Sequence, residues 1–128
     1  MNVQELATAA EQGVEVKIIL LNNAQLGMVR QQQQLFYGGR YHASCLGRPD
    51  FVAIARGFGV RAIDIGKAEN PSAALAEALR QPGPCLINVP IEGDENVYPM
   101  VPPGRANRDM ITAGQPDAQS ERRANVST

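Results

Sequence analysis

Two consecutive asparagines, Asn22 and Asn23, are the residues of this sequence whose type and position best suit binding chemistry. They directly follow residues 16–21, a short and almost continuously apolar run that predicts a strand. An amide oxygen is a neutral, hard ligand that suits Mg²⁺ or Ca²⁺, and Mg²⁺ is usually held by few protein groups together with waters and substrate phosphates. Asparagines after a strand are also ordinary turn formers. The pair alone therefore allows a metal site without establishing one.

The groups that most often carry catalysis have no recognisable partners in the sequence. His42, the single histidine, lies in an irregular stretch without a serine or cysteine motif, which favours an exposed loop residue. Cys45 and Cys85 cannot make a disulfide framework or a thiolate metal site, and each is expected to be a small buried or half-buried residue. No glycine-rich phosphate-binding loop follows a strand. The carboxylates fit solvated faces and helix caps, so no catalytic side chain is predicted.

Composition limits the class of protein. The chain has 128 residues, a formal net charge of −1 and 44% hydrophobic residues, which suits one domain with one core. The near-zero charge gives no footprint for nucleic acid or an anionic membrane. No apolar run approaches the roughly 20 residues that span a bilayer, and the N-terminus has no leader pattern. We expect a soluble, cytoplasmic protein.

Helix and strand patterns alternate from residue 2 to residue 89. The expected helices run from Asn2, as a cap with Glu5 as its capping-box partner, to Gly13, and over 50–58 and 70–80. The last helix should bury a stripe formed by Ala74, Leu75, Ala78 and Leu79. The expected strands are 16–21, 60–65 and 85–89. This order predicts an α/β fold with a parallel sheet flanked by helices.

The position of each strand can also be predicted. Residues 16–21 are apolar throughout and should be buried on both faces of the sheet. Pro90 either ends the last strand or places it near an edge. Sheets of this kind bind ligands at the carboxyl ends of their strands, and Asn22 and Asn23 lie at such an end.

Two stretches depart from the alternation. Residues 25–37 contain helix formers and the polar run Gln31–Gln34, followed by two glycines, which fits a long, helix-containing loop of the kind that is often functional. After Glu92 the chain becomes too rich in proline for a helix or a strand. We expect a folded part over residues 1–111 and a disordered tail over 112–128.

A family resemblance gives the asparagine pair a context. The segment "MNVQELATAAEQGVEVKIILL" runs into "NNAQLGMV", which resembles the second half of the thiamine-diphosphate motif that opens with Gly-Asp-Gly and closes with Asn-Asn. The similarity continues through "RQQQQLFYGGRY", "PDFVAIARGFGV", "GPCLINVPI" and "ENVYPMVPPGRANRDMI". Together, over residues 1 to 111, these segments resemble the C-terminal, cofactor-binding domain of the acetolactate synthase (acetohydroxyacid synthase) large subunit. Its specific parts here are "NN-x-x-LGMV" and "NVYPMVPPG".

The resemblance implies a role for each matching residue. Asn23 would give its side-chain oxygen, and Gln25 its backbone carbonyl, to the Mg²⁺ that holds thiamine diphosphate. The next residues would contact the cofactor, with Met28 keeping it bent: Leu26, Gly27, Met28 and Val29. Residues 25–41 and 98–111 match segments that close over the active site and exclude water.

Gln32 stands where most members of the family carry a tryptophan that packs against the second substrate. A glutamine removes that apolar wall. The implied enzyme therefore favours pyruvate over 2-oxobutyrate as its acceptor. Without the resemblance, Gln31–Gln34 would be only a polar helix face, which stays open for Gln31, Gln33 and Gln34.

The resemblance also implies missing parts. The chain starts after the Gly-Asp-Gly half of the motif, so it lacks the metal-binding aspartate, the domain with the activating glutamate and the domain that holds FAD. We expect a fragment of a longer enzyme, with no catalytic residue of its own, inactive alone and weak in Mg²⁺ affinity. The parent would use thiamine diphosphate, Mg²⁺ and FAD, form a homo-oligomer and accept a regulatory small subunit. The alternatives are another thiamine-diphosphate carboligase or decarboxylase, such as glyoxylate carboligase, and a non-catalytic α/β remnant or interaction module.

Overall fold

The computed structural model describes residues 2–47 and 49–114, and these fall into two compact units. The first, called here the sheet unit, comprises residues 1–23 and 47–91. The second, called here the loop unit, comprises residues 24–46 and the chain from Glu92 onward. The division was not anticipated from the sequence, where residues 1–111 were expected to form one folded part. Most of the tail expected to be disordered, residues 115–128, lies outside the described residues.

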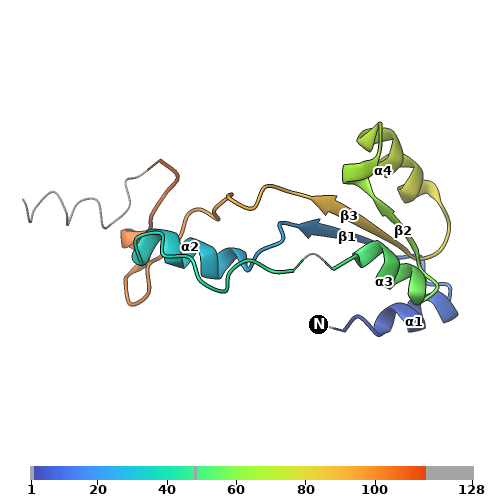
Figure 1. Ribbon diagram of the computed structural model, residues 1–128, viewed down its shortest axis with the longest axis horizontal. Coiled ribbons are helices and arrows are strands. Elements are labelled where there is room, and N and C mark those ends of the chain that lie inside the picture. The colour runs from blue at the N-terminus through green and yellow to red at the C-terminus, as the bar shows by residue number, and fades with distance from the viewer. Residues whose placement is uncertain (1, 48, 115–128) are drawn as a thin grey trace, which may run out of the picture. The chain divides into compact units, whose positions relative to one another are not determined.

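The sheet unit is built on three parallel strands, shown in Figure 1: β1 (Lys17–Asn22), β2 (Arg61–Asp64) and β3 (Cys85–Pro90). Their order is β1-β3-β2, so β3 pairs on both sides. Ile87 of β3 lies opposite both Ile19 and Ile63. The predicted α/β fold with a parallel sheet is therefore confirmed.

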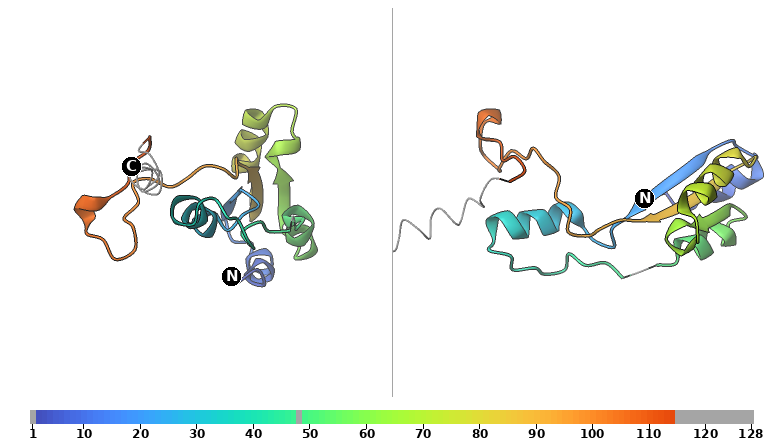
Figure 2. Two further views of the ribbon diagram at one scale, coloured as in Figure 1. Left: turned by 60° about the vertical axis from the view of Figure 1, so that its left-hand side comes forward. Right: turned by 90° about the horizontal axis from the view of Figure 1, so that it is seen from above.

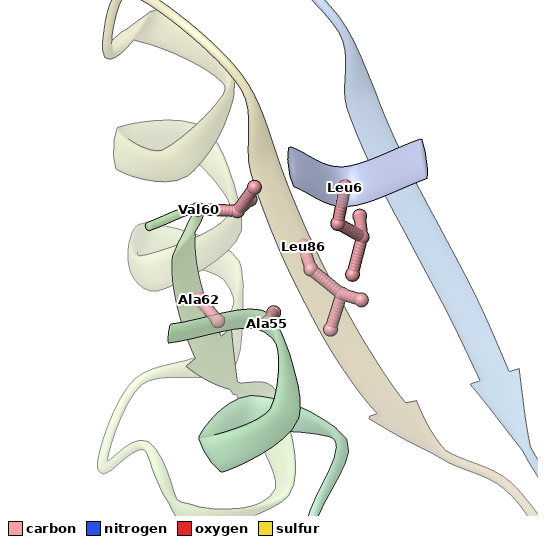
Figure 3. Packing of buried hydrophobic residues seen from close by; sticks show 5 residues of the cluster. All are labelled: Leu6, Ala55, Val60, Ala62 and Leu86. Atoms are coloured by element: carbon pink, nitrogen blue, oxygen red, sulfur yellow. The ribbon is translucent and has the colours of Figure 1, made fainter. Parts of the chain in front are cut away.

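Helices cover the two faces of the sheet unequally. Helices α1 (Glu5–Glu11) and α3 (Phe51–Gly57) lie on one side of the strands, and α4 (Pro71–Arg80) lies on the other (Figure 2). On the first side, α1 and α3 pack against even-numbered strand residues, and Figure 3 shows part of this cluster: Leu6, Ala55, Val60, Ala62 and Leu86. On the second side, α4 packs against odd-numbered strand residues, with Ala78 and Leu75 against Ile63, Cys85 and Ile87. This alternation follows from the two-residue period of a strand.

One expectation about strand position is confirmed and one about burial was wrong. Pro90 ends β3, which is the first of the two alternatives predicted, and β3 is the central strand, buried from Cys85 to Asn88. β1 is not buried on both faces, because Ile19 and Leu21 are 51% and 63% exposed. These two residues share the face of Ile87 and Val89, their register partners. On that face, the apolar cluster that α4 forms includes residues of β2 and β3 but not Ile19 or Leu21.

Local sequence signals explain where most helices begin and end. The Asp50 carboxylate accepts the Ala53 N–H at 2.9 Å, and the Asn70 amide oxygen accepts the Ala73 N–H at 3.0 Å, as expected for N-caps. Gly13, at φ +59°, ends α1 in the left-handed conformation, as predicted. The Asn2 cap was wrong, because α1 begins at Glu5 and its N-cap residue, Gln4, makes no side-chain bond. Leu79 is 47% exposed and lies outside the buried stripe expected for α4.

The loop unit contains one α-helix, α2 (Gly27–Phe36), within the described residues, which confirms the helical part of the mixed segment. Its small core is Leu35, Met100 and Ile111, with Phe36 and Tyr98 packed against them. Met100 and Ile111 exchange two backbone hydrogen bonds of 2.9 and 2.7 Å, so the proline-rich segment folds back on itself as a short bridge. No helix among residues 2–47 and 49–114 is long and apolar enough to cross a membrane.

The unequal cover of the sheet predicts unequal stability effects for two isoleucines that lie opposite each other. Ile87→Ala should lower the free energy of unfolding by about 2–5 kcal/mol, because it leaves a cavity in a fully buried strand. Ile19→Ala, the matched control, should cost less than about 1 kcal/mol because its side chain is half exposed. Urea unfolding of the two variants measures both values, and equal losses would contradict the assigned burial.

Candidate functional site

The two asparagines at the carboxyl end of β1 have different surroundings, because Asn22 is the last residue of the strand and Asn23 follows it. The Asn22 amide nitrogen donates to the Asn88 side-chain oxygen at 3.2 Å, and the Asn22 carbonyl accepts the Ile91 N–H at 3.0 Å. Asn88 is 7% exposed in the central strand, where an amide requires a hydrogen-bond partner. Asn22 therefore makes hydrogen bonds to β3 and to the residue that follows it, and so stabilises the sheet unit. Asn23 is the first residue beyond β1 and is half-buried, at the sheet end where parallel folds bind ligands.

The backbone turns sharply between the two predicted metal ligands. Ala24, between Asn23 and Gln25, has φ +53°. This left-handed conformation costs a residue with a Cβ about 1–2 kcal/mol. Backbone strain of this kind is concentrated at ligand sites, where the surrounding structure holds it in place. The turn is a feature that sequence reasoning missed, because an alanine gives no local signal for positive φ.

Gln25 lies in the loop unit, where a bridge fixes the backbone around it. The Leu26 N–H donates to the Ser44 carbonyl at 2.8 Å, and the Leu46 N–H donates to the Ala24 carbonyl at 3.0 Å. Gln25, whose carbonyl is predicted to bind metal, lies between the two residues that make these bonds on its strand of the bridge. Cys45, opposite Gln25, is exposed, so the expectation that it is buried was wrong; Cys85 is buried, as expected. The core of the loop unit is built from α2 and residues 98–111 and does not include this bridge.

The start of α2 brings together the four residues predicted to contact the cofactor. Gly27 is the first residue of the helix and Leu26 is its N-cap, without a side-chain bond to the first turn. That turn contains no acidic residue, so its N–H groups and the positive end of the helix dipole suit an anion. Leu26, Met28 and Val29 are 44%, 52% and 41% exposed. Exposed apolar side chains beside the N–H groups of a first helical turn suit a ligand with an apolar ring and an anionic tail.

The glutamine run that follows does not form one solvated face. Gln31 is 1% exposed and is bonded through its side chain to the main chain of Val97, so the expected polar face was wrong for this residue. Gln33 and Gln34 are half-buried and also bonded. Gln32, the residue predicted to set substrate specificity, is exposed. Sequence reasoning missed the role of Gln31 because its partner lies 66 residues away.

Other features of the sheet unit lie away from these residues. A cavity of about 660 Å³ lies over β2, between α3 and α4, and contains none of the predicted site residues. Hydrogen bonds from Gln81 and Arg80 lower the pKa of the Glu77 carboxyl, which lies at that cavity. In the described residues, no three His, Cys, Asp or Glu side chains cluster to hold a metal.

A comparison with known protein families identifies the family to which the chain belongs. Residues 1–89 match the family described as "Thiamine pyrophosphate enzyme, C-terminal TPP binding domain". The chain belongs to this family. Thiamine pyrophosphate is the same compound as thiamine diphosphate, so the cofactor that the family resemblance implies is confirmed. The matched residues include the whole sheet unit up to Val89, the end of β1 and helix α2.

Individual relatives narrow the resemblance within the thiamine-pyrophosphate family. The chain is 51% identical over 112 residues to the acetolactate synthase isozyme 1 large subunit of Escherichia coli K12, covering 87% of this chain and 20% of the relative. It is 47% identical over 118 residues to the acetolactate synthase large subunit of Pyropia yezoensis, covering 91% and 20%. The chain thus spans about a fifth of the length of these curated relatives. The resemblance to acetolactate synthases is confirmed.

A solved structure supports the fold of this thiamine-pyrophosphate-binding domain. Benzoylformate decarboxylase from Polynucleobacter necessarius superposes with a TM-score of 0.63 at 24% sequence identity, over 74% of this chain and 18% of that protein. At this identity the likeness concerns the fold alone. It agrees with an α/β fold built on a parallel sheet.

Proposed function

We propose that the chain supplies the C-terminal, thiamine-diphosphate-binding part of an acetolactate synthase. That enzyme condenses two pyruvates, or pyruvate and 2-oxobutyrate, with loss of CO₂, in the biosynthesis of isoleucine, valine and leucine. The observation that carries the proposal is 51% identity to an acetolactate synthase over 87% of the chain. Because the chain spans about a fifth of that relative, the complete reaction requires the counterpart of the remainder.

The chain's own residues would bind and orient the cofactor. Asn23 through its amide oxygen, and Gln25 through its carbonyl, would hold Mg²⁺, which prefers oxygen ligands and binds diphosphate at the same time. Leu26, Met28 and Val29 would contact the apolar part of the cofactor, and the first turn of α2, from Gly27, would face its anionic part. When bound, thiamine diphosphate supplies the electron sink for decarboxylation of a 2-oxo acid. FAD is assigned only to the complete enzyme, and no catalytic side chain is assigned to this chain.

The remaining assignments follow from the same proposal. The complete enzyme would act in the cytoplasm on pyruvate and 2-oxobutyrate, assemble as a homo-oligomer and accept a regulatory small subunit. The competing functions are another thiamine-diphosphate carboligase or decarboxylase and a non-catalytic interaction module. The experiment that separates them is a chimera in which this chain replaces the matching fifth of the Escherichia coli isozyme 1 large subunit. Acetolactate formed from pyruvate by this chimera would support the synthase, whereas a folded chimera without that product would contradict it.

The purified 128-residue chain, supplied with pyruvate, thiamine diphosphate, Mg²⁺ and FAD, should form no acetolactate. A neutral amide and one carbonyl are weak metal ligands by themselves, and no catalytic group is assigned to the chain. A colorimetric acetolactate assay measures this, with the intact Escherichia coli enzyme as the positive control. Turnover by the chain alone would contradict the proposal.

Asn23→Ala in the chimera should weaken Mg²⁺-dependent binding of thiamine diphosphate by roughly tenfold or more, because it removes one protein ligand of the metal. Isothermal titration at fixed Mg²⁺ measures the affinity. Asn2→Ala is the matched control, since Asn2 is exposed and distant in the chain. An unchanged affinity for the Asn23 variant would remove Asn23 from the metal site.

Gln32 should set the choice of acceptor in the chimera. With Gln32 in place, pyruvate should compete well against 2-oxobutyrate, and Gln32→Trp should shift the product ratio toward acetohydroxybutyrate by roughly tenfold through added apolar contact. A competition assay with both acceptors measures the ratio. A strong preference for 2-oxobutyrate in the unaltered chimera would contradict the role of Gln32.

A further inference from the structure

Helix α2 uses consecutive glutamines in different ways, and this division has a functional consequence. We propose that Gln31 and Gln33 are positioning residues that fix the two segments flanking α2, residues 38–46 and 92–101, while Gln32 between them stays exposed toward ligands. The inference rests on the proposed function for what those segments cover. The hydrogen bonds that carry it belong wholly to the loop unit.

The side-chain amide of Gln31 pairs with the backbone of the later segment, using one donor and one acceptor as a peptide group does. Its Nε2 donates to the Val97 carbonyl at 2.8 Å, and its Oε1 accepts the Val97 N–H at 2.9 Å. Its Nε2 also lies 3.3 Å from the Met100 sulfur. Gln31 is 1% exposed, so its amide requires these partners, whereas the Val97 side chain is 66% exposed. The contact therefore recognises the backbone of the segment and places no demand on the side chain at position 97.

Gln33 makes the same arrangement with the earlier segment. Its Nε2 donates to the His42 carbonyl at 2.8 Å, and its Oε1 accepts the His42 N–H at 3.2 Å. Two glutamines of one helix thus pair with the backbone of two different segments. Each pair uses a donor and an acceptor of one residue, so a shift of either segment by one residue would break both of its bonds.

Neighbouring side chains of α2 strengthen both attachments. Arg30 forms an ion pair of 2.8 Å with Asp94 in the later segment, and its guanidinium lies 5.2 Å from the centre of the Tyr41 ring in the earlier one. The Arg30 side chain is 11% exposed and that of Asp94 is 84% exposed, so this partly solvated ion pair adds modestly to the hydrogen bonds of the two glutamines. Gln34 accepts a bond of 3.0 Å from the Asn96 amide. Residues 30, 31, 33 and 34 are thus all engaged in fixing the two segments.

Gln32 is the exception within this run. It is exposed, and no hydrogen bond of its side chain to another described residue is found. Its two neighbours hold the flanking segments by backbone pairing, so its side chain can change without releasing either segment. The arrangement separates specificity, at position 32, from positioning, at positions 31 and 33.

Amide hydrogen exchange of the 128-residue chain, followed by NMR, tests the positioning role with three matched variants. Gln31→Met keeps the size and flexibility of the side chain but removes both bonds. It should speed exchange of the Val97 N–H roughly 10- to 100-fold and leave the His42 N–H unchanged. Gln33→Met should show the reverse pattern. Gln32→Met is the control and should change neither proton.

Two further measurements keep this test decisive. The Ile87 N–H of the central strand serves as the reference for global unfolding, because it should not respond to a local change. If Gln31→Met also speeds exchange of the Ile87 N–H, the variant is globally destabilised and the chain without substitutions is measured instead. In that chain, the side-chain amide protons of Gln31 and Gln33 should exchange more slowly than those of Gln32. Equal rates for the three side chains, or a Val97 N–H that Gln31→Met changes less than twofold, would overturn the proposal.

The functional consequence is tested in the chimera by product partition. If the segments exclude water, Gln31→Met should raise several-fold the share of pyruvate that loses CO₂, takes up a proton and leaves as acetaldehyde, instead of bonding to a second pyruvate. Gln4→Met, an exposed position in the sheet unit, is the control. A chimera that makes no acetolactate contradicts the proposed function but leaves the exchange result standing. Normal synthesis with an unchanged acetaldehyde share contradicts the positioning role.

Discussion

The buried central strand β3 is the constraint on which the sheet unit depends. It pairs in parallel with β1 on one side and β2 on the other, and its residues from Cys85 to Asn88 are buried. Because β3 sets the register of both neighbours, it also sets where their carboxyl ends lie. Asn88 extends this control to the edge strand by accepting a hydrogen bond from Asn22. The position of Asn23, one residue further, thus follows from the pairing of β1 with β3.

The parts that the sequence predicts well are those decided by neighbours in the chain. The helix caps Asp50 and Asn70 and the left-handed Gly13 act within a few residues, so local patterns suffice to find them. The alternation of helix and strand likewise predicts the parallel sheet. The prediction of Asn2 as a cap used the same local reasoning and was wrong, since Gln4 is the residue that precedes α1 and it makes no side-chain bond. A capping signal in the sequence thus does not by itself determine the residue at which a helix begins.

The parts that the sequence could not predict depend on contacts between distant residues. The hydrophobicity of Ile19 and Leu21 predicted that both side chains are buried, but they are exposed. Burial of a strand depends on which helix packs against it, and α4 packs over β2 and β3. The same limit explains Gln31, whose burial follows from pairing with the backbone 66 residues away. The contact residues 26–29 were predicted from the family resemblance, and the structure places all four at the start of a single helix.

Side-chain amides perform three different tasks in this chain, and position alone distinguishes them. Asn22 and Asn88 pair with each other inside the sheet, whereas Gln31 and Gln33 pair with backbone in the loop unit. Asn23, at the end of β1 and beside the left-handed Ala24, is the amide whose place suits a ligand. An amide is neutral, donates and accepts, and costs less to bury than a carboxylate. These properties let one functional group join two strands in the sheet unit and pair with main-chain peptide groups in the loop unit.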